Sequence, residues 1–233
     1  MSIPRRVQRK VQTWSQRRRL RSIYEQLKEF TMIQPRVFVE NLTLAERVRE
    51  VPGCVVECGV WRGGMSAGIG KVLGPGRDYF LFDSFEGLPP AKEIDGQAAL
   101  EWQSAKEAPT YFDNCSAGTE YAERAMREAG IKTFHLKKGW FEKSLPGFKP
   151  PAPIALLRLD GDWYDSTMVC LSQLFDFVAP GGLIILDDYY TWDGCSRALH
   201  DFLSRRSAAE RIQSFGAVCF LEKKPPTASE KTA

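Results

Sequence analysis

The sequence contains little histidine, with His135 and His200 as its two residues among 233. Zinc sites and Ser-His hydrolase triads both draw on histidine, so the sequence offers little support for either chemistry. The six cysteines show no CxxC spacing, which disfavours a redox or zinc motif. Several of them lie in apolar, strand-like runs, where a thiol packs as a small hydrophobic group. We therefore expect reduced, mostly structural thiols.

Long apolar runs are also missing. No stretch approaches the roughly 18 residues that a membrane span needs, and no apolar signal segment follows the arginine-rich start. We expect a cytoplasmic protein without a membrane span. Residues 1–21 lack acidic side chains and carry eight Lys or Arg. This basic N-terminal arm could touch nucleic acid or an anionic membrane, but no aromatic residues interleave regularly with the arginines. Nucleic acid is therefore disfavoured as a partner, and a frayed, solvated helix is the favoured interpretation.

Apolar periodicity predicts one α/β domain with appendages. Residues 22–50 have helical spacing interrupted by Pro35, which indicates a helical lead-in. After residue 50, short apolar runs alternate with helical segments, a pattern typical of a parallel, doubly wound sheet. The expected strands are 54–58, 79–83, 133–137, 154–160 and 183–187, and the expected helices end at Leu73 or span 119–129, 168–178 and 196–205.

Three further segments complete the expected organisation. A hairpin over 211–222 would add a last antiparallel strand to the sheet, so that residues 51–222 form the main domain. Residues 89–115 are too long for an ordinary loop and contain Trp102, which suggests a lid over a bound substrate or an insertion with a small core of its own. The polar tail at 223–233 is expected to be disordered.

Acidic residues stand at the ends of the expected strands, where doubly wound sheets bind their ligands. The first strand ends in Glu57 and enters a glycine-rich turn that begins at Gly59. The glycines permit a tight turn and close approach of a ligand, but the spacing is not the GxGxxG of pyrophosphate-binding turns. An acid before the turn suits a cationic amino-acid group better than a phosphate. A nicotinamide cofactor is therefore the weaker choice.

The next two strand ends favour a nucleoside. Asp83 ends the second strand, where a carboxylate can accept hydrogen bonds from both ribose hydroxyls. Gly139 and Trp140 follow the third strand, and the indole offers an aromatic face for a purine. Each feature has a plain structural alternative, such as a simple turn or a helix cap. Together they favour S-adenosylmethionine as the cofactor.

The fourth and fifth strands end in a second group of acids: Asp160, Asp187 and Asp188. Neighbouring carboxylates repel one another unless they are paired, and a divalent cation would remove the conflict. An all-oxygen site with room for water suits Mg²⁺ or Mn²⁺ better than zinc. The alternative is that these residues are helix caps and exposed loop acids. Asp162 stands two residues beyond Asp160 and is the candidate general base.

Five blocks, taken in order, resemble the macrocin O-methyltransferase family of metal-dependent, sugar-methylating enzymes from antibiotic biosynthesis. The resemblance spans roughly residues 38–220 and rests on VECGVWRGGMS, LFDSFEGLP, KGWFEKSLP, LRLDGDWYDST and LDDYYTWDGC. It implies the class I S-adenosylmethionine-dependent methyltransferase fold, a Rossmann-like, seven-stranded, mostly parallel sheet with a C-terminal antiparallel strand. It also implies Mg²⁺ ligands at Asp160, Asp187 and Asp188 and a general base at Asp162. The cofactor-binding candidates are then Glu57, Gly59, Ser66, Asp83, Ser84, Gly139 and Trp140.

The expected function is Mg²⁺-dependent O-methyl transfer to a hydroxyl of a sugar-bearing small molecule, either a glycosylated natural product or a glycan. A catechol-type phenolic acceptor uses the same metal chemistry and is the nearest rival. A nicotinamide-dependent oxidoreductase and a non-catalytic cofactor-binding module remain as alternatives from other classes. The short basic arm departs from the longer N-terminal segments of the family, so the identity of the acceptor does not transfer. The helical lead-in could pair subunits into a homo-oligomer.

Overall fold

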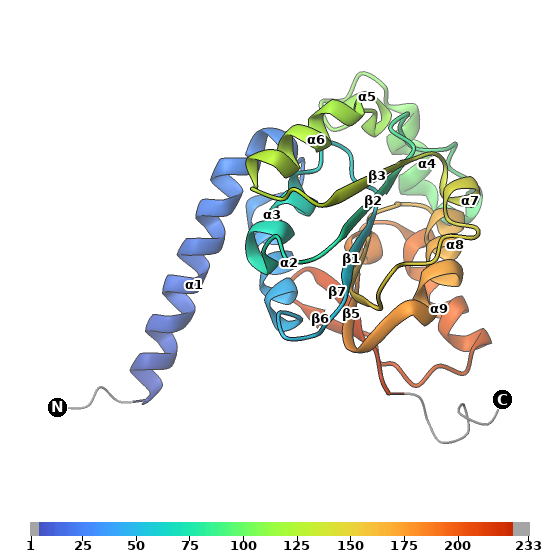
Figure 1. The fold of residues 1–233 in the computed structure, drawn as a ribbon. Coiled ribbons are helices and arrows are strands. Elements are labelled where there is room, and N and C mark those ends of the chain that lie inside the picture. Colours follow the sequence, from blue (N-terminus) through green and yellow to red (C-terminus); the bar gives the residue numbers. More distant parts are fainter. Residues whose placement is uncertain (1–4, 226–233) are drawn as a thin grey trace.

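A seven-stranded sheet lies at the centre of the protein, in the order β3-β2-β1-β4-β5-β7-β6 (Figure 1). The computed structural model describes residues 5–225, with side chains from Trp14 onward. Strands β1 to β5 are parallel, β7 runs antiparallel to β5, and β6 runs antiparallel to β7. The strands are β1 Cys54–Cys58, β2 Tyr79–Asp83, β3 Phe134–Lys138, β4 Ile154–Leu159, β5 Val178–Leu186, β6 Gln213–Phe215 and β7 Val218–Glu222.

The sheet confirms the expected fold class, because a C-terminal antiparallel hairpin is added at one edge of an otherwise parallel α/β sheet. Strands β1 and β2 have the bounds that the sequence predicts. Strand β5 differs, since it begins at Val178 rather than at residue 183. The helix before it, α8, ends at Leu174 instead of continuing to 178, and a short 3₁₀ turn, η3 Phe175–Phe177, follows. Pro180 and two glycines thus belong to the strand, where the pairing with β4 shifts register.

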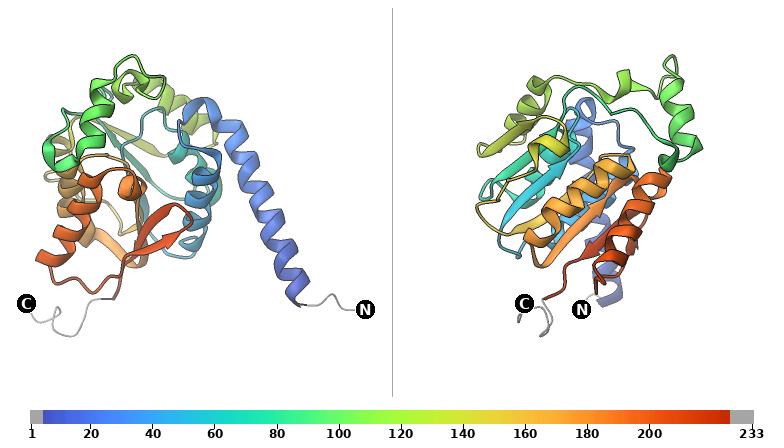
Figure 2. Two further views of the ribbon diagram at one scale, coloured as in Figure 1. Left: turned by 180° about the vertical axis from the view of Figure 1, so that it is seen from behind. Right: turned by 90° about the vertical axis from the view of Figure 1, so that its right-hand side faces the viewer.

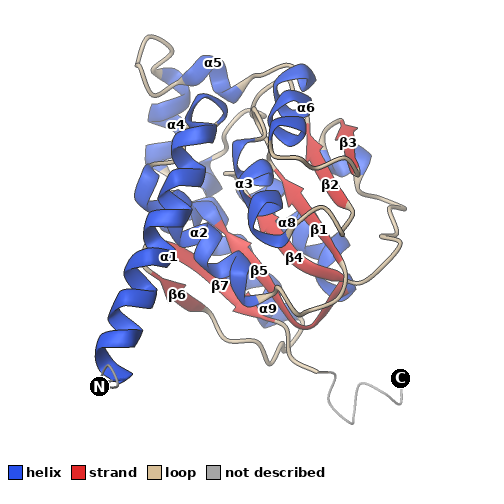
Figure 3. Cartoon of the chain, turned by 60° about the vertical axis from the view of Figure 1, so that its left-hand side comes forward, coloured by secondary structure: helices blue, strands red, loops and turns tan. Residues whose placement is uncertain are grey.

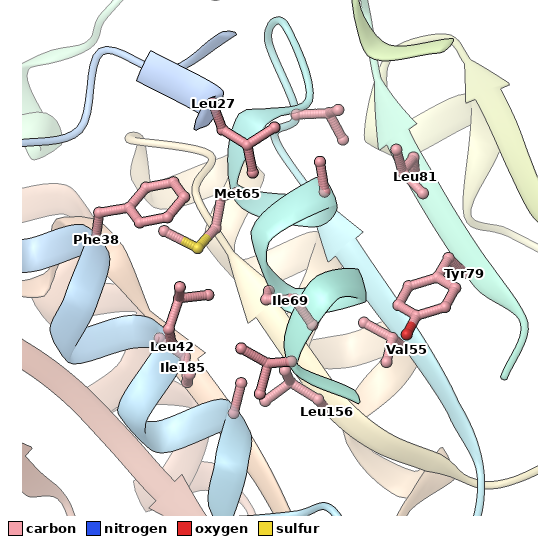
Figure 4. Packing of buried hydrophobic residues seen from close by; sticks show 14 of the residues in the cluster. Leu27, Phe38, Leu42, Val55, Met65, Ile69, Tyr79, Leu81, Leu156 and Ile185 are labelled. Atoms are coloured by element: carbon pink, nitrogen blue, oxygen red, sulfur yellow. The ribbon is translucent and has the colours of Figure 1, made fainter. Parts of the chain in front are cut away.

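Helices cover both faces of the sheet, as Figure 3 shows. On one face, α2, α3 and the end of α1 pack with α6 against one alternate set of strand side chains (Figure 4). On the other face, α8 and α9 pack against the opposite set. The helices are α1 Arg5–Leu27, α2 Pro35–Arg47, α3 Gly64–Leu73, α4 Gln97–Ser104, α5 Phe112–Cys115, α6 Thr119–Glu128, α7 Phe141–Ser144, α8 Tyr164–Leu174 and α9 Asp193–Arg205, with 3₁₀ turns η1 Lys28–Phe30, η2 Glu93–Asp95 and η4 Asp187–Tyr190.

The N-terminal helix crosses the expected boundary between a basic arm and a helical lead-in. Helix α1 continues without a break from Arg5 to Leu27, and its first part runs away from the body of the protein (Figure 2). Its last turns are anchored by Leu20 and Leu27, which are buried. Pro35 stands at the first turn of α2, where its fixed φ suits a helix start. Within residues 5–225, none of the helices has the length and apolar character that a membrane crossing requires.

The insertion at 89–115 contains η2, α4 and α5 and is built around an aromatic cluster. The Trp102 ring lies 6.2 Å from Trp163 and 6.0 Å from Trp192, measured between ring centroids. Trp102 also packs against Tyr111 within the insertion. Trp102 is therefore held by neighbouring rings and does not line the cavity described below. The expected tail at 223–233 falls mostly outside the described residues.

Candidate active site

A cavity of about 740 Å³ opens at the carboxyl ends of the central strands. Its wall combines the ends of β1, β2, β4 and β5 with the linker between η1 and α2 and with the start of the insertion. Such a volume is within the usual range for small-molecule sites. The strand order places β1 next to both β2 and β4, so the acids at these strand ends face one common space.

Glu57 is a buried acid near the end of β1 and lines the cavity. Val55, two residues earlier in the strand, faces the layer of α2 and α3, so the Glu57 carboxylate lies on that same face of the sheet. Oε1 accepts a hydrogen bond of 2.6 Å from Arg158, and Oε2 accepts one from Ser66 Oγ. Burial raises the pKa of Glu57 to about 7, while Arg158 and Ser66 act in the opposite direction.

Asp83 organises the glycine-rich turn. Its Oδ2 accepts hydrogen bonds from the backbone N–H groups of Val60, at 2.6 Å, and Trp61, at 2.8 Å. Its Oδ1 accepts one from Phe85 N at 2.7 Å. Burial raises the pKa of Asp83, and these backbone donors lower it. Asp83 also lines the cavity, and its three backbone hydrogen bonds hold the turn in place beside it.

The other cofactor-binding candidates divide into those in the wall and those behind it. Gly59 and Trp140 line the cavity, as does Ser84, whose hydroxyl donates to Gly87 O. Ser66 and Gly139 do not line it: Ser66 supports Glu57 from behind, and Gly139 donates its N–H to Asp83 O. Ser66 and Gly139 therefore contact the residues of the cavity wall rather than the cavity itself.

Gly59 is required by the packing of two strand ends. Its φ of +89° lies in the left-handed region, and a Cβ there would lie 1.8 Å from Asp160 O. The sequence suggested that this glycine admits a ligand. The structure shows that it admits the backbone of the neighbouring strand end, which draws the β1 and β4 acids together.

Asp160, Asp187 and Asp188 converge beside Glu57. Ligand oxygens of the three carboxylates lie within 4.8 Å of one another. Asp188 is buried, and burial raises its pKa well above the usual range, with the carboxylates of Asp162 and Asp160 adding to the effect. Its Oδ2 accepts a hydrogen bond from Asp162 N at 3.2 Å. Three oxygen donors this close, with room for water in the cavity, fit a hard divalent cation.

Arg158 supplies one positive charge under these acids. It stands inside the apolar strand β4 and is fully buried. Its guanidinium lies 2.6 Å from Glu57 and 2.8 Å from Asp160 through Nη1, and 2.7 Å from Asp187 through Nη2. Although burial lowers it, the carboxylates of Asp160 and Asp187 hold the pKa of Arg158 well above its usual range. This arginine compensates part of the charge and leaves Asp188 without a cationic partner among the described residues.

Asp162 lies in the wall next to these ligand candidates. Its φ of +59° places it in the left-handed region, which is costly for an aspartate. Its Oδ1 accepts a hydrogen bond of 2.8 Å from Trp192 Nε1. Burial, followed by the Asp160 carboxylate, raises the pKa of Asp162 well above its usual range, and the Trp192 hydrogen bond opposes this. A carboxylate with a raised pKa is suited to accepting a proton.

Comparison with known proteins identifies the family. A family model described as Macrocin-O-methyltransferase (TylF) matches residues 4–224. The chain belongs to this family. It is 34% identical over 172 residues to the 8-demethyl-8-(2,3-dimethoxy-alpha-L-rhamnosyl)-tetracenomycin-C 4'-O-methyltransferase of Streptomyces olivaceus. It is 32% identical over 171 residues to the mycinamicin III 3''-O-methyltransferase of Micromonospora griseorubida. These matches cover 70% of this chain and 62% and 65% of the relatives, so the chain spans less than two thirds of their length.

Solved structures agree with the macrocin O-methyltransferase assignment. The structure of the O-methyltransferase NovP has a TM-score of 0.70 and 27% sequence identity, and the match covers 84% of this chain and 83% of NovP. The calicheamicin methyltransferase CalS11 has a TM-score of 0.64 at 19% identity, with coverage of 95% and 94%. The second similarity shows the fold alone. Both the expected family and the expected class I methyltransferase fold are confirmed.

Sequence reasoning missed Arg158, Asn41 and Trp192. The run LLRLD contains an arginine, so either this segment is not a buried strand or the arginine is a buried charge with acidic partners, because a lone buried charge is too costly. Asn41 is the polar residue on the apolar face of α2, and the same reasoning applies to it. Trp192 carried no such signal, since a tryptophan after an acidic strand end is compatible with many environments.

Proposed function

We propose that this protein is an S-adenosylmethionine-dependent O-methyltransferase that methylates a sugar hydroxyl of a glycosylated natural product. Family membership supports the reaction type, and the names of the two curated relatives support a sugar-bearing acceptor. The observation that carries the proposal is the meeting of two acidic groups in one cavity. Glu57 and Asp83 line the cofactor half, and Asp160, Asp187 and Asp188 line the metal half.

Asp160, Asp187 and Asp188 would hold Mg²⁺ or Mn²⁺. Their converging oxygens support this fit, as does Asp188, which has no cationic partner among the side chains of residues 14–225. When bound, such a cation orients an acceptor hydroxyl and lowers its pKa. Arg158 orients two of the three carboxylates before any cation arrives, because its guanidinium contacts Asp160 and Asp187.

Asp162 acts as the general base. The acceptor hydroxyl gives its proton to an Asp162 carboxylate oxygen while its own oxygen attacks the sulfonium methyl group. The new O–CH₃ bond forms as the CH₃–S bond breaks, and the electron pair of that bond passes to sulfur, which leaves S-adenosylhomocysteine. The chain contributes by holding both reactants in one cavity, since proximity and orientation supply much of the rate.

The charge of the wall favours a neutral or amino-bearing acceptor. Lys143 and Arg158 are its basic residues, and Arg158 is already paired with acids. Acidic residues line both halves, and Glu86 and Glu142 add to them in the wall. A sugar attached to a nucleoside diphosphate would bring two negative charges into this field. We therefore place the acceptor sugar on a completed glycoside.

The test is methyl transfer from isotopically labelled S-adenosylmethionine. Purified protein is incubated with neutral glycosides, the matching diphosphate-linked sugars and catechols, each with and without a chelator. Chelator-sensitive labelling of a neutral glycoside is the expected result. Labelling of catechols alone moves the protein to the phenolic class, and binding of NAD without binding of S-adenosylmethionine contradicts methyl transfer altogether.

A further inference from the structure

Helix α2 contacts the acids of the metal half of the cavity through the side chain of Asn41. Asn41 shares the inner face of α2 with Phe38 and Leu42, and all three are fully buried. A polar amide on such a face is costly unless its donors and acceptor are used. Its contacts are therefore informative about its role.

Both ends of the Asn41 amide are occupied at the site. Oδ1 accepts a hydrogen bond from Arg158 Nε at 3.2 Å. Nδ2 donates to Asp187 Oδ1 at 3.1 Å and to Val37 O at 3.1 Å within its own helix. Asn41 does not line the cavity, so it does not touch a substrate or cofactor there. It contacts one metal-ligand candidate and the arginine that holds two of them.

We propose that Asn41 is a positioning residue for divalent-cation binding: it fixes Asp187 and the Arg158 guanidinium, and thereby makes α2 part of the metal site. The proposal rests on the proposed function, because it presumes that Asp187 is a metal ligand. The amide opposes rotation of the Asp187 carboxylate, since Nδ2 holds the same oxygen that faces Arg158 Nη2. Residues that orient metal ligands in this way typically change metal affinity 10- to 100-fold when they are replaced.

The first test measures metal binding without catalysis. Leucine has nearly the shape of asparagine, and Asn41→Leu removes both hydrogen bonds to the site together with the one to Val37 O. We expect its Mn²⁺ dissociation constant, measured by titration calorimetry, to rise by about 10-fold or more. Its affinity for S-adenosylhomocysteine should stay within about twofold of the native value, because Asn41 lies outside the cavity wall.

Thr43→Val is the matched control on the same helix. Thr43 Oγ1 donates to Val39 O at 2.7 Å, four residues back, as Asn41 Nδ2 does to Val37 O. This variant removes a local helix bond without any contact to the site, so its Mn²⁺ affinity should be native. Equal Mn²⁺ affinities for Asn41→Leu and the native protein would overturn the proposal. A parallel loss of S-adenosylhomocysteine binding in Asn41→Leu would also overturn it, because it reports a general role in folding.

A second measurement uses the unaltered protein and decides the matter if Asn41→Leu does not fold. Asn41 and Asn114 are the two asparagines of the chain, so selective labelling gives two side-chain amide signals. Addition of Mg²⁺ should shift the Asn41 signal more than that of Asn114, which lies in the insertion and donates a hydrogen bond to Leu88 O. An unmoved Asn41 signal in protein that binds Mg²⁺ contradicts the proposal. Native protein that binds neither Mn²⁺ nor Mg²⁺ would instead contradict the metal site in the proposed function.

Discussion

The two halves of the cavity treat their carboxylates differently. In the half formed by β1 and β2, Glu57 and Asp83 accept hydrogen bonds from protein donors on both oxygens. In the half formed by β4 and β5, Asp188 accepts one long hydrogen bond and has no cationic partner among the described side chains. The first half has its hydrogen bonds in place as folded, whereas in the second half Arg158 pairs with Asp160 and Asp187 and leaves Asp188 without a cation among the described residues.

This difference indicates where an external cation belongs. Buried acids that the chain already satisfies need no further partner and can serve as a fixed frame for an organic ligand. Buried acids that face one another raise each other's pKa until a cation joins them. The two halves should therefore respond differently to substitution. Changes in the β4 and β5 half should alter the metal dependence of turnover, and changes in the β1 and β2 half should alter the affinity for the cofactor.

Asp188→Asn should have the largest effect. The amide keeps the shape of the side chain but removes a charge from the three-carboxylate group, and a bound cation contributes several kcal/mol to such reactions. We expect turnover to fall to the background seen with a chelator, while calorimetry still detects S-adenosylhomocysteine binding. Continued stimulation of the variant by Mg²⁺ would show that the cation binds elsewhere and would remove the contrast between the halves.

Asp162→Asn should lower kcat by roughly 10²–10⁴, the usual scale for the loss of a general base. The Trp192 indole can still donate to the amide oxygen, so the local structure is retained. Mn²⁺ and S-adenosylhomocysteine affinities should remain near native, which separates this residue from Asp188. Single-turnover rates with a neutral glycoside provide the measurement, and a native rate would exclude Asp162 as the base.

Asp83→Asn tests the other half. The amide nitrogen would face either the N–H groups of Val60 and Trp61 or that of Phe85, and hydrogen bonds to a charged group are worth about 1.5–3 kcal/mol. We expect roughly 10- to 100-fold weaker binding of S-adenosylhomocysteine with native Mn²⁺ affinity. If Mn²⁺ affinity fell to the same extent, the two halves would have to be treated as one electrostatic unit.

The sequence predicts the bounds of β1 and β2 and the position of acidic residues at strand ends, because both depend on local pattern. Strand β1 and its terminal Glu57 follow from a short β-branched run before a glycine. Arg158 contacts Asp160 two residues away, but it lies 101 residues from Glu57, and Asn41 lies 146 residues from Asp187. Only the alternation of the strands and the crossing of α2 bring these side chains together, and neither the partner nor the distance can be read from spacing.

The insertion illustrates the same limit. Its length predicts an unusual segment, but the sequence does not say whether Trp102 faces a sugar or the protein. In the structure the Trp102 ring packs against Trp163 and Trp192. The left-handed turn from Phe112 to Cys115 is also unforeseen, because four successive residues other than glycine rarely adopt positive φ.

Trp192→Phe should have the smallest effect, and it tests how far Asp162 depends on the hydrogen bond that the Trp192 indole donates. The substitution removes the 2.8 Å hydrogen bond to Asp162 Oδ1 and keeps an aromatic ring against Trp163. We expect kcat to fall about 10-fold with little change in acceptor KM, because a hydrogen bond to a charged group is worth about 1.5 kcal/mol or more. Trp102→Phe is the matched control, since its indole donates to Thr110 O and not to Asp162. Equal losses in the two variants would mean that the aromatic cluster acts through packing, whereas a loss confined to Trp192→Phe assigns the effect to the hydrogen bond that orients the base.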